Sequence, residues 1–170
     1  MRKTVKLMPG FSILRTSLVL SLLSSTACAE EYLVKDQDAF KEAVKSAEAG
    51  DVSAAATALR ETEEEIGITP DDIALIGRLP SFDSVSTFRV TPFVGLVDPD
   101  ASIVEDPNEV DDVFEVPLAF FMNVRNHKPR TVEHEGVTYH LHDMPWKNRN
   151  VWGMTAMMLR QLYQRAYKDD

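Results

Sequence analysis

Apolar residues recur at helical spacing in three stretches of the chain. Residues three or four positions apart share one face of a helix, so the pattern predicts helices over residues 36–49, 54–66 and 151–167. Glycine is common just past the end of a helix, and Gly50 and Gly67 directly follow the first two stretches. These glycines set the expected C-terminal limits of both helices.

Runs rich in β-branched and aromatic residues lie between the predicted helices and have the composition of strands. The expected strands cover residues 73–79, 88–97, 113–116 and 137–142. A short helix is expected over residues 118–124. Several adjacent strands among helices favour an α+β fold over a doubly wound parallel sheet, in which strands and helices alternate.

The first 29 residues contain the three parts of a secretory signal peptide. A basic start at Arg2 and Lys3 is followed by an apolar run over residues 18–23 and by small residues that end at Ala29. We therefore predict a signal-peptide-like segment over residues 1–29. A lipoprotein acylated at Cys28 and an amphipathic N-terminal helix are the alternatives. No apolar run reaches the roughly 18–20 residues that a membrane-spanning helix needs.

The charge balance is acidic, with 18 Lys and Arg against 27 Asp and Glu and a net charge of −9. Nucleic-acid binding relies on clustered Lys and Arg, so this balance argues against a nucleic-acid partner. Hydrophobic residues make up 44% of the chain, which suffices for a core and argues against disorder. The single cysteine excludes an internal disulfide.

Carboxylates gather on one face of the second predicted helix. Glu61, Glu64 and Glu65 are three or four residues apart, so their like charges lie close together and repel each other. Arg60, four residues before Glu64, offsets only part of this charge. Mg²⁺ or Mn²⁺ would offset the rest, because both prefer oxygen ligands and leave positions open for a phosphate. A solvated acidic helix face is the alternative interpretation.

The same stretch resembles the second half of the Nudix box. Arg60-Glu61, Glu64-Glu65, Gly67 and Ile68 match the box at its fixed spacing, and Thr62 departs from its first aliphatic position. The surrounding sequence is similar to the coenzyme A pyrophosphatase branch of that family, in residues 56–59, 80–85, 90–95, 108–118 and 152–156. The resemblance implies a Nudix-like mixed sheet with flanking helices over residues 51–170.

This resemblance also implies an activity. Nudix hydrolases cleave a diphosphate bond in a nucleoside diphosphate linked to another group, and this branch acts on coenzyme A or a related derivative. The implied cofactor is Mg²⁺ or Mn²⁺, and the implied partner is a small-molecule diphosphate substrate. By the family pattern Glu64 and Glu65 would hold metal, and Glu61 would be a ligand or an orienting group.

Four further residues receive roles from the same comparison. Glu109 would bring another carboxylate to the site from a loop, as a metal ligand or as the general base. Arg60 would form a structural salt bridge that ties the helix to its loop. Asp83 and Ser84 follow a predicted strand and would contact the substrate.

The first half of the Nudix box has no counterpart in this sequence. Ser46 and Val52 stand where the signature has its first glycine and its first glutamate, and no predicted strands occupy the places before the box. A domain truncated at its N-terminal strands is therefore expected. Residues 1–50 resemble instead the signal peptide and start of an alginate-lyase-type secreted protein. In this interpretation residues 30–50 are a foreign or linker helix.

These departures lead to a hypothesis of a fusion between two unrelated gene ends near residue 50. An alternative to the hydrolase is then a catalytically inactive Nudix-like fragment, and a third interpretation is an exported protein with a role unrelated to nucleotides. The leader favours export, whereas a coenzyme A hydrolase is expected in the cytoplasm.

Overall fold

The computed structural model describes residues 2–7, 17–25, 52–83, 89–110, 113–134 and 136–167. The predicted helix over residues 36–49, the foreign or linker segment over residues 30–50 and the substrate-contact candidate Ser84 lie outside the described residues. Among the helices that the structure describes, none is long and apolar enough to cross a membrane.

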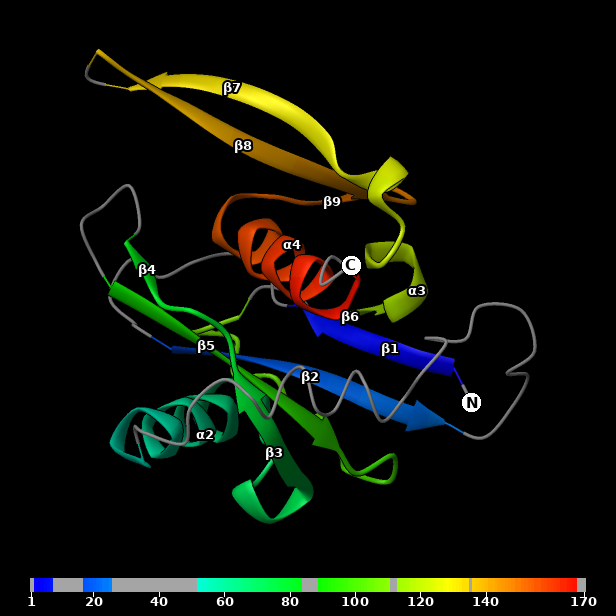
Figure 1. The fold of residues 1–170 in the computed structure, drawn as a ribbon. Coiled ribbons are helices and arrows are strands. Elements are labelled where there is room, and N and C mark those ends of the chain that lie inside the picture. The colour runs from blue at the N-terminus through cyan, green and yellow to red at the C-terminus, as the bar shows by residue number, and fades with distance from the viewer. Residues whose placement is uncertain are drawn as a thin grey trace.

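A mixed sheet forms the centre of the molecule (Figure 1). Its strands run in the order β3 (Ile73–Arg78), β5 (Arg89–Val97), β2 (Ser17–Ser25), β1 (Arg2–Leu7) and β6 (Phe114–Pro117), and β4 (Phe82–Asp83) pairs with β5. The pairing of β2 with β5 is parallel, and the other pairings are antiparallel. This combination of a mixed sheet with helices agrees with the expected α+β class.

The strands β1 and β2 come from the segment that the sequence analysis assigned to a leader. Leu20 of β2 lies opposite Val94 of β5, and Val5 of β1 lies opposite Val116 of β6. The alternative of an N-terminal helix is therefore wrong for these residues. The places before α2 (Val52–Ile66) that we expected to be empty contain two strands. The apolar run over residues 18–23 is compatible with a strand as well as with a leader. Export itself stays a prediction.

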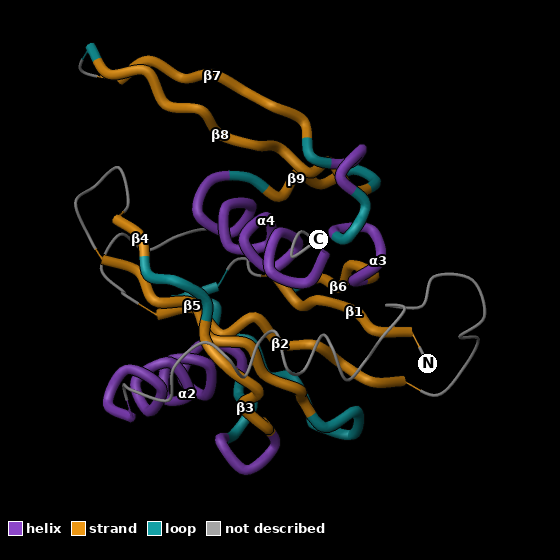
Figure 2. The backbone as a smooth tube through the Cα atoms, viewed as in Figure 1, coloured by secondary structure: helices purple, strands orange, loops and turns teal. Residues whose placement is uncertain are grey.

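Helices cover both faces of the sheet around β5, as Figure 2 shows for α2 and α4 (Gly153–Tyr167). Phe93 of β5 packs with Ala58 of α2, whereas its neighbour Val94 belongs to the core beneath α4. Successive residues of a strand point to opposite faces, so β5 is buried on both sides. The central sheet is thus the middle one of three layers, with α2 and α4 on opposite faces of β5.

The larger core lies between the sheet and α4. Its fully buried side chains come from α3 (Leu118–Phe121), α4 and the strands and loops around them: Leu79, Val94, Val116, Leu118, Phe121, Met144, Ala156, Leu159 and Leu162. Ala156, Leu159 and Leu162 recur every third residue and form the buried stripe of α4. The helix predicted over residues 118–124 ends earlier, and a 3-10 turn follows at η2 (Val124–Asn126).

A second sheet projects from the outer side of α4 (Figure 1). It consists of β7 (Lys128–His134), β8 (Val137–Trp146) and β9 (Arg149–Val151), paired in that order. The predicted hairpin strand at 137–142 is confirmed within β8, and the sequence analysis did not predict β7. The last predicted helix begins at Gly153 rather than at residue 151, because Val151 pairs with Met144 in the sheet.

His127 is buried where α3 and η2 lead into this second sheet. Its Nε2 lies 2.7 Å from the carbonyl oxygen of Phe121, and since a carbonyl only accepts, Nε2 donates. Burial lowers the pKa of His127 below its ordinary value. The Phe121 hydrogen bond partly opposes this shift of the pKa, and the positive charge of Arg160 adds to it. The folded protein therefore favours the neutral form of His127 more than the unfolded chain does.

We expect the free energy of unfolding to fall as the pH drops below about 6.5, where the unfolded chain takes up a proton at His127 and the folded chain does not. Urea unfolding at pH 5.5 and 7.5 measures this loss. In His127→Gln, which retains a donor for Phe121, the difference between the two pH values should shrink. His140→Gln, at an exposed position on β8, is the control and should behave as wild type. An unchanged pH dependence in His127→Gln would contradict the assignment.

Candidate functional site

The helix α2 carries the carboxylates, and its packing gives each of them a different environment. Ala58 is buried against Phe93, and Glu61 lies one turn further along the same face. Only 6% of Glu61 is exposed, whereas Glu65 is half-buried and Glu64 is exposed. The three glutamates therefore form a row that runs from the core to the solvent.

The burial of Glu61 is the least expected property of this row. An ionised carboxylate inside a protein is costly unless it is paired, hydrogen-bonded or bound to a cation, so structural glutamates are seldom fully buried. Its neighbour Thr62 is buried as well, and the Thr62 hydroxyl donates a hydrogen bond of 2.9 Å to the carbonyl oxygen of Ala58. This part of α2 thus carries polar groups on the face that packs against the sheet.

Arg60 binds Glu64 on the outer side of α2. The Arg60 Nη1 atom lies 2.6 Å and 2.7 Å from the two carboxylate oxygens of Glu64. Both side chains are largely exposed, so solvent screens the pair and its contribution to stability is small. We expected Arg60 to form a salt bridge that ties α2 to a loop. Its salt bridge with Glu64 instead joins two residues of the same helix.

A loop closes over the C-terminal end of α2. Gly67 has a φ of +70° and donates its backbone N–H to the carbonyl oxygen of Glu63 at 2.9 Å. The chain then returns through Val104 and Asp106, whose backbone N–H groups donate to Ile66 O and Glu65 O, each at 3.0 Å. These bonds satisfy carbonyls that the end of a helix leaves without an intrahelical partner.

The same loop brings Glu109 to this end of α2. The backbone N–H groups of Glu109 and Val110 both donate to the carbonyl oxygen of Asp106, the residue that is bound to Glu65 O. Val110 is buried in one apolar cluster with Ile66. The fold therefore brings the half-buried Glu109 to the helix end that carries Glu65, although the two are 44 positions apart in sequence.

Asp106 is a residue whose role the sequence analysis missed. Its Oδ1 accepts hydrogen bonds of 2.9 Å from both the backbone N–H and the side-chain amide of Asn108. The turn that carries Glu109 is thus fixed by the side chain of Asp106 and by its backbone. An Asp followed by Pro and Asn is a typical turn signature, and this signal was present in the sequence.

The structure does not bring Asp83 close to the end of α2. Asp83 lies opposite Arg89 at the start of β5, whereas Ile66 packs with Val97 at the other end of that strand. These ends are ~26 Å apart, at ~3.3 Å for each residue step along a strand. A substrate that contacts both regions has to be extended.

The donor set of α2 suits Mg²⁺ or Mn²⁺ because it consists of carboxylate oxygens alone. In the part of the chain that the structure describes, however, no three His, Cys, Asp or Glu side chains are grouped closely enough to hold a metal ion. Both oxygens of Glu64 face Arg60. Glu64 would have to turn away from Arg60 before it could bind a cation together with Glu61 and Glu65.

A comparison with known proteins identifies the family. The family model of the NUDIX domain matches residues 46–141, which include α2, the loop that follows it and Glu109. The chain belongs to the Nudix family. It is 40% identical over 112 residues to a protein of Escherichia coli described as an uncharacterized Nudix hydrolase NudL, a match that covers 66% of this chain. The corresponding protein of Escherichia fergusonii is 39% identical over 112 residues. The chain spans 58% of the length of these curated relatives.

Gly67 should be essential for the contact between α2 and the loop. A Cβ atom at Gly67 would lie 3.0 Å from the Cβ of Val104, in a backbone conformation that disfavours other residues. Gly136 has a similar φ of +76°, but a Cβ atom there would meet nothing within 4 Å. Gly136→Ala therefore measures the conformational cost alone, about 1 kcal/mol.

We expect Gly67→Ala to lower the free energy of unfolding by clearly more than Gly136→Ala does, because the loop has to shift as well. Urea unfolding of both variants and wild type gives the comparison. Equal losses in the two variants would show that Val104 does not limit the space at Gly67.

Proposed function

We propose that this chain hydrolyses the diphosphate bond of a nucleoside diphosphate derivative, with Mg²⁺ or Mn²⁺ as its cofactor. The observation that carries the proposal is the row of Glu61, Glu64 and Glu65 on α2, with the loop of Glu109 bound to the same helix end. Membership of the Nudix family supports it. The sequence alone had already suggested these four residues.

The residues of the site would have different roles in the reaction. Glu61, Glu64 and Glu65 would hold the cation, which when bound neutralises charge on the diphosphate oxygens. Glu109 would bring a further carboxylate oxygen to the cation from the loop and would accept a proton from the attacking water. The water oxygen would then bond to phosphorus as the bridging P–O bond breaks.

Arg60 would control whether Glu64 can bind the cation. While Arg60 holds both oxygens of Glu64, that carboxylate is neutralised and its repulsion of Glu61 and Glu65 is reduced. Because the pair is exposed, exchanging Arg60 for a cation costs little. The arrangement favours a site that is completed when cation and substrate bind.

For the substrate we propose coenzyme A or a related derivative. The support is the similarity of residues 80–85, 90–95 and 152–156 to the coenzyme A pyrophosphatase branch. The separation of Asp83 from the end of α2 is in keeping with an extended substrate of this kind. We further propose that Asp83 and Ser84 contact the part of the substrate remote from the reacting phosphate.

Glu64→Gln and Glu65→Gln each remove a negative charge at constant size, and we expect either to lower kcat roughly a hundredfold or more. The assay is the release of adenosine 3′,5′-bisphosphate from coenzyme A by the full chain with Mg²⁺ or Mn²⁺. Activity should also disappear on addition of a chelator and return with excess metal.

Glu63→Gln is the matched control, because Glu63 is exposed on the same helix and is not one of the proposed ligands. It should retain wild-type activity. If wild type and Glu64→Gln were equally inactive, the chain would instead be an inactive Nudix-like fragment.

A further inference from the structure

The loop after β5 contains two turns of the same kind. Each begins with an aspartate followed by a proline, at Asp98-Pro99 and at Asp106-Pro107. In both turns Oδ1 of the aspartate accepts the backbone N–H two residues further on, at 2.9 Å. The aspartate carbonyl oxygen accepts the N–H three residues further on, from Ala101 at 3.1 Å and from Glu109 at 3.0 Å. Aspartate and proline at these positions favour such a turn, so the two differ mainly in what they are attached to.

Only the second of these turns is bonded to the proposed site. The N–H of Asp98 donates to the carbonyl oxygen of Asp72 at 2.8 Å, at the end of η1 (Pro70–Asp72), which is not part of that site. The N–H of Asp106 donates to the carbonyl oxygen of Glu65 at 3.0 Å, and its own carbonyl oxygen accepts the N–H of Glu109. Asp106 therefore joins a proposed metal ligand on α2 to the proposed ligand and base in the loop.

The side chain of Asp106 is engaged with the loop as well. Its Oδ1 accepts a second hydrogen bond of 2.9 Å, from the side-chain amide of Asn108. Asp106 is half-buried, whereas Asn108 is exposed. A carboxylate used in this way closes the turn that carries Glu109. Residues that orient metal ligands without binding the metal themselves have the same relation to the ligand.

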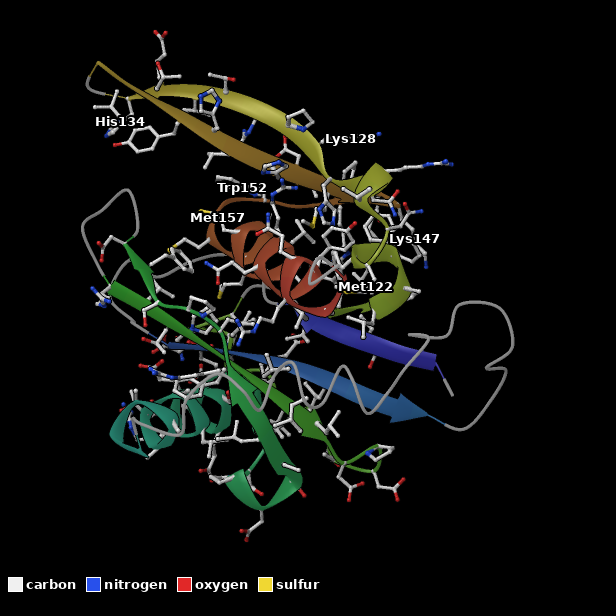
Figure 3. All side chains as sticks on the ribbon, viewed as in Figure 1. Met122, Lys128, His134, Lys147, Trp152 and Met157 are labelled. Atoms are coloured by element: carbon white, nitrogen blue, oxygen red, sulfur yellow. The ribbon has the colours of Figure 1, made fainter. Side chains whose placement is uncertain are left out.

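The prominent side chains on the other side of the central sheet are remote from this loop. Figure 3 shows Trp152 and Met157 at α4, and Lys128 and His134 at the two ends of β7. These elements lie on the face of the sheet opposite to α2, whose end is bonded to the loop. Asp106, which is bonded directly to Glu109, is the residue placed to orient it.

We propose that Asp106 is the positioning residue of Glu109. The inference rests on the proposed function, in which Glu109 brings a carboxylate oxygen to the cation and accepts a proton from the attacking water. Asp106 would fix the place of Glu109 relative to Glu65 through its backbone, and its side chain would keep the turn closed. Metal ligands and bases act only within a narrow geometry, so an open turn would lower both cation affinity and activity.

Two exchanges at Asp106 separate positioning from direct metal binding. Asp106→Asn removes the charge but keeps an oxygen that accepts the N–H of Asn108, and asparagine suits this turn. Asp106→Glu keeps the charge but moves the carboxylate away from the turn. We expect Asp106→Asn to bind Mn²⁺ as wild type does, and Asp106→Glu and Asp106→Ala to weaken Mn²⁺ binding by roughly tenfold. Electron paramagnetic resonance of the free ion, on the full chain, measures this affinity.

A double variant measures whether Asp106 acts through Glu109. Asp106→Ala should weaken Mn²⁺ binding in the wild-type background but add little in Glu109→Gln, in which the positioned carboxylate is already lost. The kcat for coenzyme A should show the same pattern. The loss of stability on urea unfolding should instead be similar in both backgrounds, because the turn opens in each. The same unfolding curves show that every variant is folded.

Asp98→Ala is the matched control. It opens the other aspartate-proline turn of the same loop, and it should lower the free energy of unfolding as Asp106→Ala does. Its Mn²⁺ affinity and its kcat should equal those of wild type, because its turn is not bonded to the proposed site.

Four results would overturn the inference. They are unchanged Mn²⁺ affinity in both Asp106→Ala and Asp106→Glu, a loss in Asp106→Asn with none in Asp106→Glu, equal losses from Asp106→Ala with and without Glu109→Gln, and no Mn²⁺ binding by wild type. A chain that shows the coupling in Mn²⁺ affinity but does not hydrolyse coenzyme A would contradict only the proposed function. An active chain in which the two losses simply add would contradict only the positioning.

Discussion

The hydrogen bonds between the end of α2 and the loop after β5 are the constraint on which the candidate site depends. The last carbonyls of a helix need partners, and Val104 and Asp106 supply them to Ile66 and Glu65. Gly67 makes room for this approach, since a side chain there would meet Val104. Together with the apolar contact between Val110 and Ile66, these bonds carry Glu109 to the end of α2 that bears Glu65.

The helix α2 carries both the apolar residues that stabilise its packing on the sheet and the glutamates proposed for the chemistry. Its apolar residues pack on β5, but Glu61 occupies a position on the buried face where an apolar residue would stabilise the fold more. Glu64 is neutralised by Arg60 at the surface, and Glu65 lies between these two environments. The burial of Glu61 beside the more exposed Glu64 and Glu65 is in keeping with the cation-binding role proposed above.

The sequence predicted α2 and β5 well, because an amphipathic period and a β-rich composition are local signals. It did not predict the strand over residues 17–25, since a short apolar run is compatible with a leader and with a strand, and the pairing of this strand with β5 is not local. The strand β7 contains Pro129 and lacks a clear alternation, so its pairing with β8 defines it. The glutamates were predicted from their spacing and from family resemblance. The proximity of Glu109 to α2 depends on tertiary contacts that no local pattern reveals.

The most direct test of a single site shared by α2 and its loop is the affinity for Mn²⁺, measured on the full chain by electron paramagnetic resonance of the free ion. Glu65→Gln and Glu109→Gln should each weaken Mn²⁺ binding by roughly tenfold or more, and Glu63→Gln should leave it unchanged. Mn²⁺ binding that is equally strong in wild type, Glu65→Gln and Glu109→Gln would contradict the account.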